Sequence, residues 1–131
     1  MNAAVLPSEP RQVIATLARI LSGYAYRFSS EVHLHDAIDA TLTANGWAFE
    51  REVSGDASNR FDFWCAGIVI EIKVDGSLSQ ALRQVDRYAA LDGVHGVLLA
   101  ATPAWARSAS TAPCELQGTP IAIAHLSRQS L

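Results

Sequence analysis

The chain has 131 residues and a formal net charge of −3, with 50% hydrophobic and 18% charged residues. This length and composition fit one folded domain and exclude a disordered chain. The negative charge excludes a protein that grips nucleic acid over its whole surface, so such a contact would have to be local.

The sequence shows no sign of export or membrane insertion. No apolar stretch approaches the roughly 20 residues of a membrane span, and residues 1–10 lack the basic and apolar regions of a secretion signal. The two cysteines, Cys65 and Cys114, have no metal-ligand spacing and make only a weak case for a disulfide. We therefore expect a cytoplasmic protein without membrane partners.

The N-terminal part of the chain predicts two helices. Pro10 suits the first turn of a helix over residues 10–21, where apolar residues recur at helical spacing. A second helix is expected to start at Ser29 or Ser30, either of which could cap it, and to end before Asn45-Gly46.

The rest of the chain alternates strands and helices. A third helix begins at Ser77 or Ser79 and ends near residue 91, and residues 103–108 form a helical turn. Strands are predicted at 47–53, 60–65, 68–74, 96–101 and 120–126. The order α-α-β-β-β-α-β-α-β predicts a single α/β domain over 1–131, with one central mixed sheet flanked by helices.

The second and third strands are separated only by Ala66-Gly67, which predicts a hairpin with a two-residue turn. In that register Asp62 faces Glu71, and directly opposed Cβ atoms lie about 4.5–5.5 Å apart. Lys73, two residues beyond Glu71, shares the same face of the sheet. The hairpin therefore brings two carboxylates and one ammonium together.

This cluster has a functional and a structural interpretation. Opposed carboxylates repel each other, and a divalent cation would compensate because hard cations take carboxylate oxygens. Lys73, the only lysine among ten basic residues, could then orient or deprotonate a water, or neutralise charge on a phosphate. The structural alternative is an exposed strand face with a Glu-x-Lys ion pair. A ladder of ion pairs would, however, place opposite charges across the hairpin, whereas Asp62 and Glu71 carry the same charge.

Glu31 is a further candidate ligand at the start of the second helix. Leu34, Ile38 and Leu42 should face the sheet, and Glu31 lies on the same stripe, so it could point toward the cluster. The alternative is a solvated glutamate that is favoured at the helix N-terminus by the helix dipole.

The third helix carries polar residues beside its apolar stripe. Gln80, Gln84 and Tyr88 are spaced by four residues, and Arg83 and Arg87 lie nearby. Amide, phenol and guanidinium groups suit contacts to phosphate and sugar. The alternative is an ordinary polar helix face.

Together these motifs resemble the PD-(D/E)XK nuclease superfamily, which has the restriction-endonuclease-like fold. The resemblance rests on Arg60-Phe61-Asp62, on Glu71-Ile72-Lys73, and on the segment from Gln84 to Tyr88, which is similar to the Gln-x-x-x-Tyr motif of RecB-type nucleases. The placement of Glu31 is similar to that of the helix glutamate in archaeal Holliday-junction resolvases. Phe61 stands where the proline that names the family would be.

The resemblance implies a restriction-endonuclease-like core over about residues 29–126, preceded by a helical extension over 1–28. It further implies that Asp62, Glu71, Glu31 and the Ile72 carbonyl hold Mg²⁺ or Mn²⁺. Lys73 and Gln84 would complete the catalytic set, with Lys73 activating water.

The leading hypothesis is a metal-dependent deoxyribonuclease that hydrolyses phosphodiester bonds. Tyr88, Arg60, Arg83 and Arg87 are the predicted DNA contacts. One alternative is a catalytically silent module of this fold that binds DNA or a protein partner. Another is a structural or oligomerisation domain whose charged hairpin is exposed. A homodimer, or a place in a larger DNA-processing complex, would lengthen the short DNA footprint of so small a domain.

Overall fold

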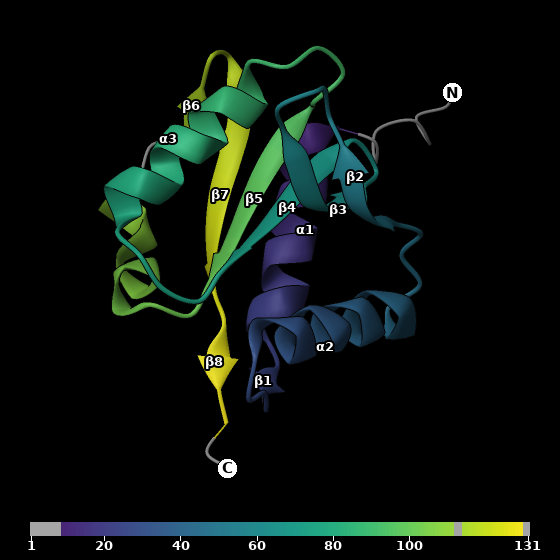
Figure 1. The fold of residues 1–131 in the computed structure, drawn as a ribbon, viewed down its shortest axis with the longest axis vertical. Coiled ribbons are helices and arrows are strands. Elements are labelled where there is room, and N and C mark those ends of the chain that lie inside the picture. The colour runs from purple at the N-terminus through teal and green to yellow at the C-terminus, as the bar shows by residue number, and fades with distance from the viewer. Residues whose placement is uncertain (1–8, 112–113, 130–131) are drawn as a thin grey trace.

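The computed structural model describes residues 9–111 and 114–129. A six-stranded mixed sheet separates two layers of helices, as the sequence predicted for the general class (Figure 1). The helices are α1 (Pro10–Ser22), α2 (Glu31–Ala44), α3 (Leu78–Ala89) and the 3-10 helix η2 (Ala104–Thr111). The strands are β1 (Ala25–Tyr26), β2 (Glu50–Ser54), β3 (Arg60–Cys65), β4 (Ile68–Lys73), β5 (Gly96–Ala101), β6 (Glu115–Leu116), β7 (Thr119–His125) and β8 (Ser127–Arg128). Within these residues, no helix has the length and apolar character needed to cross a membrane.

The main sheet has the strand order β2-β3-β4-β5-β7-β6. The β2-β3-β4 part is an antiparallel meander, β4, β5 and β7 are parallel, and β6 returns antiparallel to β7. β1 and β8 form a separate parallel pair that joins the segment after α1 to the C-terminal end of the described chain. The central strand β5 is buried along its whole length, as a strand covered on both faces must be.

Each face of the sheet has its own hydrophobic core. On one face α1 and α2 bury Leu17 and Leu34 against β4 and β5. On the other face α3 and η2 cover the sheet through Val85 and Trp105. In Figure 1, α1 lies behind the sheet, α3 lies in front of it, and α2 crosses below. The hairpin of β3 and β4 therefore has helices on both sides.

The N-terminal ends of α2 and α3 are set by the serine side chains that cap them. The Ser30 hydroxyl accepts a hydrogen bond from the His33 N–H, so Ser30, not Ser29, is the cap of α2. Ser77, not Ser79, caps α3, and it forms a reciprocal capping box with Gln80.

The predicted element boundaries differ from the structure in a few places. β2 begins at Glu50 and not at residue 47, because the Trp47 N–H donates a hydrogen bond to the Leu42 carbonyl at the C-terminal end of α2. α3 ends at Ala89, two residues before the predicted end near residue 91. The short strands β1, β6 and β8 were not predicted, since two residues show no periodicity.

Candidate active site

The hairpin of β3 and β4 has the predicted register. Ala66 and Gly67 both adopt positive φ angles, 53° and 83°, which a two-residue type I′ turn requires. The paired residues are Phe63 with Ile70, Trp64 with Val69 and Cys65 with Ile68. The ladder ends there, so the predicted pair of Asp62 with Glu71 is not part of it.

Asp62 lies where the regular alternation of β3 is interrupted. Phe61 packs in the core under α3, whereas Phe63 packs in the core under α1 and α2. On a regular strand, residues two apart point to the same face. Glu52 of β2, which would pair with Asp62 in a regular ladder, has a φ of 52°. The ladder between β2 and β3 has pairs on either side of this position but none at it. Both strands are therefore distorted at the candidate site.

The distortion turns the Asp62 carboxylate toward β4. Its Oδ2 accepts a hydrogen bond from the Ile72 N–H at 2.8 Å. In a regular antiparallel ladder, that N–H would donate to the carbonyl of Phe61. The N–H and C=O of one strand residue point to the same neighbour, so the Ile72 carbonyl also points toward β3. Asp62 and the backbone of Ile72 are thereby brought together.

Glu71 is the buried member of the cluster. Only 6% of its side chain is exposed, and its Oε1 has no hydrogen-bond partner among the described residues. Burial, and then repulsion by Asp62, raises the pKa of Glu71 to about 8, against the opposing effect of the Lys73 ammonium. Burial raises the pKa of Asp62 as well. A buried carboxylate with an unpartnered oxygen is unusual in a folded protein and marks a candidate ligand site.

Lys73 neutralises part of this negative charge. Its Nζ lies 3.7 Å from Glu71 Oε2, and 30% of its side chain is exposed. The structure therefore brings Asp62, Glu71 and Lys73 together, with Lys73 on the open side.

His35 belongs to the same cluster, and the sequence analysis missed it. Its Nε2 lies 3.9 Å from Asp62 Oδ2, and this buried nitrogen has no hydrogen-bond partner in the part of the chain that the structure describes. The spacing of four residues from Glu31 could have identified it, because residues i and i+4 share a helix face.

Glu31 lies on the same side of α2 but is exposed, as the solvated alternative expected. It is still close enough for its charge to raise the pKa of Asp62. Glu31 is thus an outer neighbour of the cluster and not a buried one.

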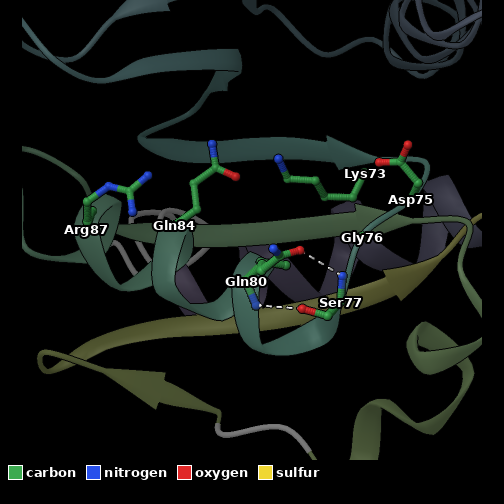
Figure 2. A pocket seen from close by; sticks show the side chains of 8 residues that line it. Lys73, Asp75, Gly76, Ser77, Gln80, Gln84 and Arg87 are labelled. Atoms are coloured by element: carbon green, nitrogen blue, oxygen red, sulfur yellow. Dashed lines mark hydrogen bonds between the residues drawn. The ribbon is translucent and has the colours of Figure 1, made fainter.

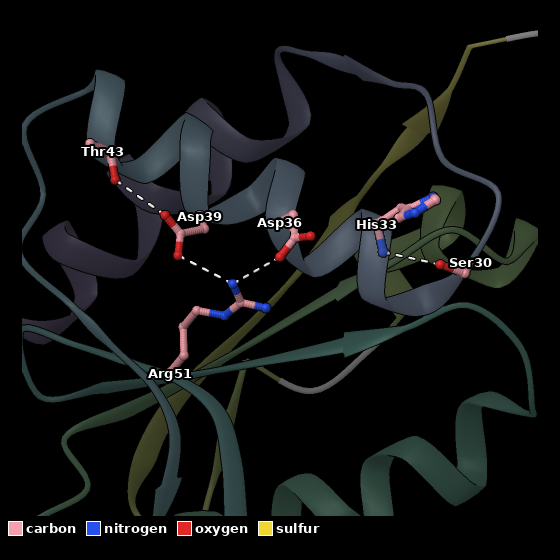
Figure 3. A network of polar contacts seen from close by, with 6 residues as sticks. All are labelled: Ser30, His33, Asp36, Asp39, Thr43 and Arg51. Atoms are coloured by element: carbon pink, nitrogen blue, oxygen red, sulfur yellow. Dashed lines mark hydrogen bonds and ion pairs between the residues drawn. The ribbon is translucent and has the colours of Figure 1, made fainter.

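An arginine on the edge strand fixes the position of α2. The Arg51 guanidinium lies 3.0 Å from Asp36 and 3.4 Å from Asp39, both on α2 (Figure 3). It also lies over the Phe63 ring, 5.6 Å from its centre. These contacts hold the helix that carries His35 against β2 and β3.

Gln84 and Tyr88 connect α3 to β3. The Gln84 amide donates to the Tyr88 hydroxyl at 2.8 Å, and that hydroxyl donates to the Arg60 carbonyl at 3.1 Å. Tyr88 is only 2% exposed, and its ring meets the edge of Phe61 at a centroid distance of 5.1 Å. Direct DNA contact by Tyr88 stays a prediction, and its burial favours a supporting role.

The predicted arginine contacts have different surroundings. Arg60 forms an ion pair with Glu52 at 2.9 Å. Arg87 lines a pocket of about 330 Å³ together with Lys73 and Gln84 (Figure 2). Arg83 lines a separate hollow beside Leu116.

A divalent cation requires several donor atoms close together. In residues 9–111 and 114–129, no group of three or more His, Cys, Asp or Glu side chains has the arrangement of a metal site. However, the buried Glu71 Oε1 and His35 Nε2 both lack hydrogen-bond partners among the described residues, and the Ile72 carbonyl points toward β3. Carboxylate and carbonyl oxygens are the donors that Mg²⁺ and Mn²⁺ take, so the chemistry of the residues fits such an ion.

Comparisons with protein-family models, with curated proteins and with solved structures find no match for this chain. The function of the chain is therefore inferred from the geometry of the site.

Proposed function

We propose that the protein is a metal-dependent nuclease that hydrolyses phosphodiester bonds in DNA, with a restriction-endonuclease-like core. The observation that carries this proposal is the buried Glu71 carboxylate in a cluster with Asp62 and Lys73, since its Oε1 has no hydrogen-bond partner within the described part of the chain. Mere packing does not require two repelling carboxylates at this position.

Each residue has a distinct part in the proposed reaction. Asp62, Glu71 and the Ile72 carbonyl would hold Mg²⁺ or Mn²⁺, and His35 is near enough to add a fourth donor after a small shift. When bound, the ion supplies Lewis acidity and lowers the pKa of a water. Lys73 would orient the attacking water and balance the charge that develops on the phosphate.

The catalytically silent module remains the second candidate, and one observation favours it. Asp62 Oδ2 already accepts the Ile72 N–H, so one of its oxygens is engaged without a metal. Such a module would keep this hydrogen bond as a structural link and would bind no cation.

The test is hydrolysis by the purified chain, with Mg²⁺ and with Mn²⁺, on duplex, single-stranded and branched DNA. Metal-dependent cleavage is expected, and Lys73→Ala should reduce its rate by about 10²–10⁴-fold. Arg19→Ala is the control, since Arg19 is exposed on α1, a helix that contributes no residue to the cluster. No cleavage of any substrate by folded wild-type protein would refute the proposal.

A further inference from the structure

A polar pocket opens beside Lys73, between the end of β4 and the face of α3. It has a volume of about 330 Å³, which lies at the lower end of the usual range for ligand sites. Lys73, Gln80, Gln84 and Arg87 contribute its longest side chains. In Figure 2, Lys73 extends along its strand toward Gln84, and Arg87 lies beyond Gln84 on α3. Two cationic groups therefore stand on either side of an amide.

Arg87 is available to an anion, unlike three of the other arginines of the chain. Arg11, Arg51 and Arg60 each form an ion pair with a carboxylate. Within residues 9–111 and 114–129, the Arg87 guanidinium has no hydrogen bond or ion pair, and the side chain lines the pocket. The one carboxylate in the pocket lining belongs to Asp75, at the opposite end from Arg87 (Figure 2).

The floor of the pocket is fixed by contacts to the following elements. The Trp105 indole donates to the Gly76 carbonyl at 2.9 Å, and the Thr102 hydroxyl donates to the Val74 carbonyl at 3.3 Å. Gly76 has a φ of +85°, and a Cβ there would lie 3.4 Å from the Gln80 amide oxygen. A side chain at this position would be strained and would narrow the pocket. The backbone at this end of the pocket is thus held in place, and Gln84 is held by its hydrogen bond to Tyr88, which lowers the entropic cost of ordering these groups on binding.

From these features we infer that Arg87 and Gln84 form a subsite for a second phosphate of the nucleic-acid strand whose scissile phosphate is handled at Lys73. This inference rests on the proposed function. Guanidinium binds a phosphate through two parallel hydrogen bonds, and an amide can serve either sugar or phosphate. The strand would run along α3, from Lys73 toward Arg87.

The test measures binding separately from hydrolysis. A fluorescently labelled short DNA strand is titrated with the full chain in EDTA at several salt concentrations, and anisotropy gives Kd. Arg87→Ala should weaken binding about tenfold and lower the slope of log K against log salt by roughly 0.7–0.9, the value of one lost phosphate contact. Arg19→Ala, an exposed arginine of α1, should change neither.

Three further outcomes are informative. If Arg87→Ala binds like wild type while Lys73→Ala abolishes hydrolysis, the subsite is wrong and the proposed function stands. If wild type binds DNA through Arg87 but hydrolyses none, the subsite stands and the proposed function fails. If inorganic phosphate binds through Arg87 but the DNA strand does not bind, the pocket accepts a small phosphate and the inference is overturned.

Discussion

The carboxylate of Asp62 takes the place of a backbone carbonyl, because its Oδ2 accepts the Ile72 N–H at 2.8 Å beyond the last ladder pair of β3 and β4. The side chain therefore has two roles, since it closes the open end of the hairpin and supplies charge to the cluster. The two roles can be separated by substitution.

Asp62→Asn and Asp62→Ala should differ in stability but not in activity. Asparagine keeps an oxygen that can accept the Ile72 N–H, whereas alanine leaves a part-buried donor unsatisfied at a cost of about 1–3 kcal/mol. Both variants lose the charge, so neither should hydrolyse DNA. Urea unfolding and cleavage assays measure the two effects, and equal stability of the variants would show that the hydrogen bond contributes nothing.

Glu71 should make the metal-free protein less stable as the pH rises. Its pKa is raised from 4.5 to about 8 in the folded state, so between those values the folded chain binds more protons than the unfolded chain. The free energy of unfolding then falls with rising pH. Each unit of pKa shift corresponds to about 1.4 kcal/mol, so the free energy of unfolding should decrease by a few kcal/mol between about pH 5 and pH 8.

Urea unfolding in EDTA at pH 5 and pH 8 measures this decrease. Glu71→Gln removes the titrating group, so its stability should depend much less on pH. Mn²⁺ should restore stability to wild type at pH 8, because an ion that binds only the folded state stabilises it. A wild-type protein that is more stable at pH 8 than at pH 5 in EDTA would contradict the assignment.

The sequence predicted the parts of the site that depend on local periodicity. The Ala66-Gly67 turn sets the hairpin register, and Glu71 lies near Asp62 as that register predicts, although the ladder itself ends one pair earlier. The interruption at Asp62 was not predictable, because it depends on Phe61 packing under α3 while Phe63 packs under α1 and α2. That choice is made by tertiary contacts and not by the pattern of the strand.

The position of α2 was also beyond the reach of the sequence. An apolar stripe predicts which side of a helix faces the sheet, but not which strand its first turn meets. The packing of the buried face of α2 on the sheet sets this position, and the contacts of Arg51 with Asp36 and Asp39 support it. His35 then lies next to Asp62.

Tyr88→Phe should reduce stability without reducing DNA affinity. The substitution removes the hydroxyl that joins Gln84 to the Arg60 carbonyl, and one buried hydrogen bond contributes about 1 kcal/mol. The ring stays against Phe61, so the fold is retained. Thermal unfolding and anisotropy measure the two quantities. A weaker DNA complex at unchanged stability would show that Tyr88 contacts the substrate directly.

His35→Ala should weaken binding of Mn²⁺ by about 10–100-fold, the usual cost of losing a group that supports or completes a metal site. The physical reason is that His35 Nε2 is buried, unpartnered among the described residues, and 3.9 Å from Asp62. His33→Ala is the matched control, since His33 is an exposed residue of the same helix and its ring pairs with Ser29. The increase in melting temperature as Mn²⁺ is added gives the affinity of each variant. If both histidine variants bind Mn²⁺ like wild type, His35 is a packing residue and the metal is held without it.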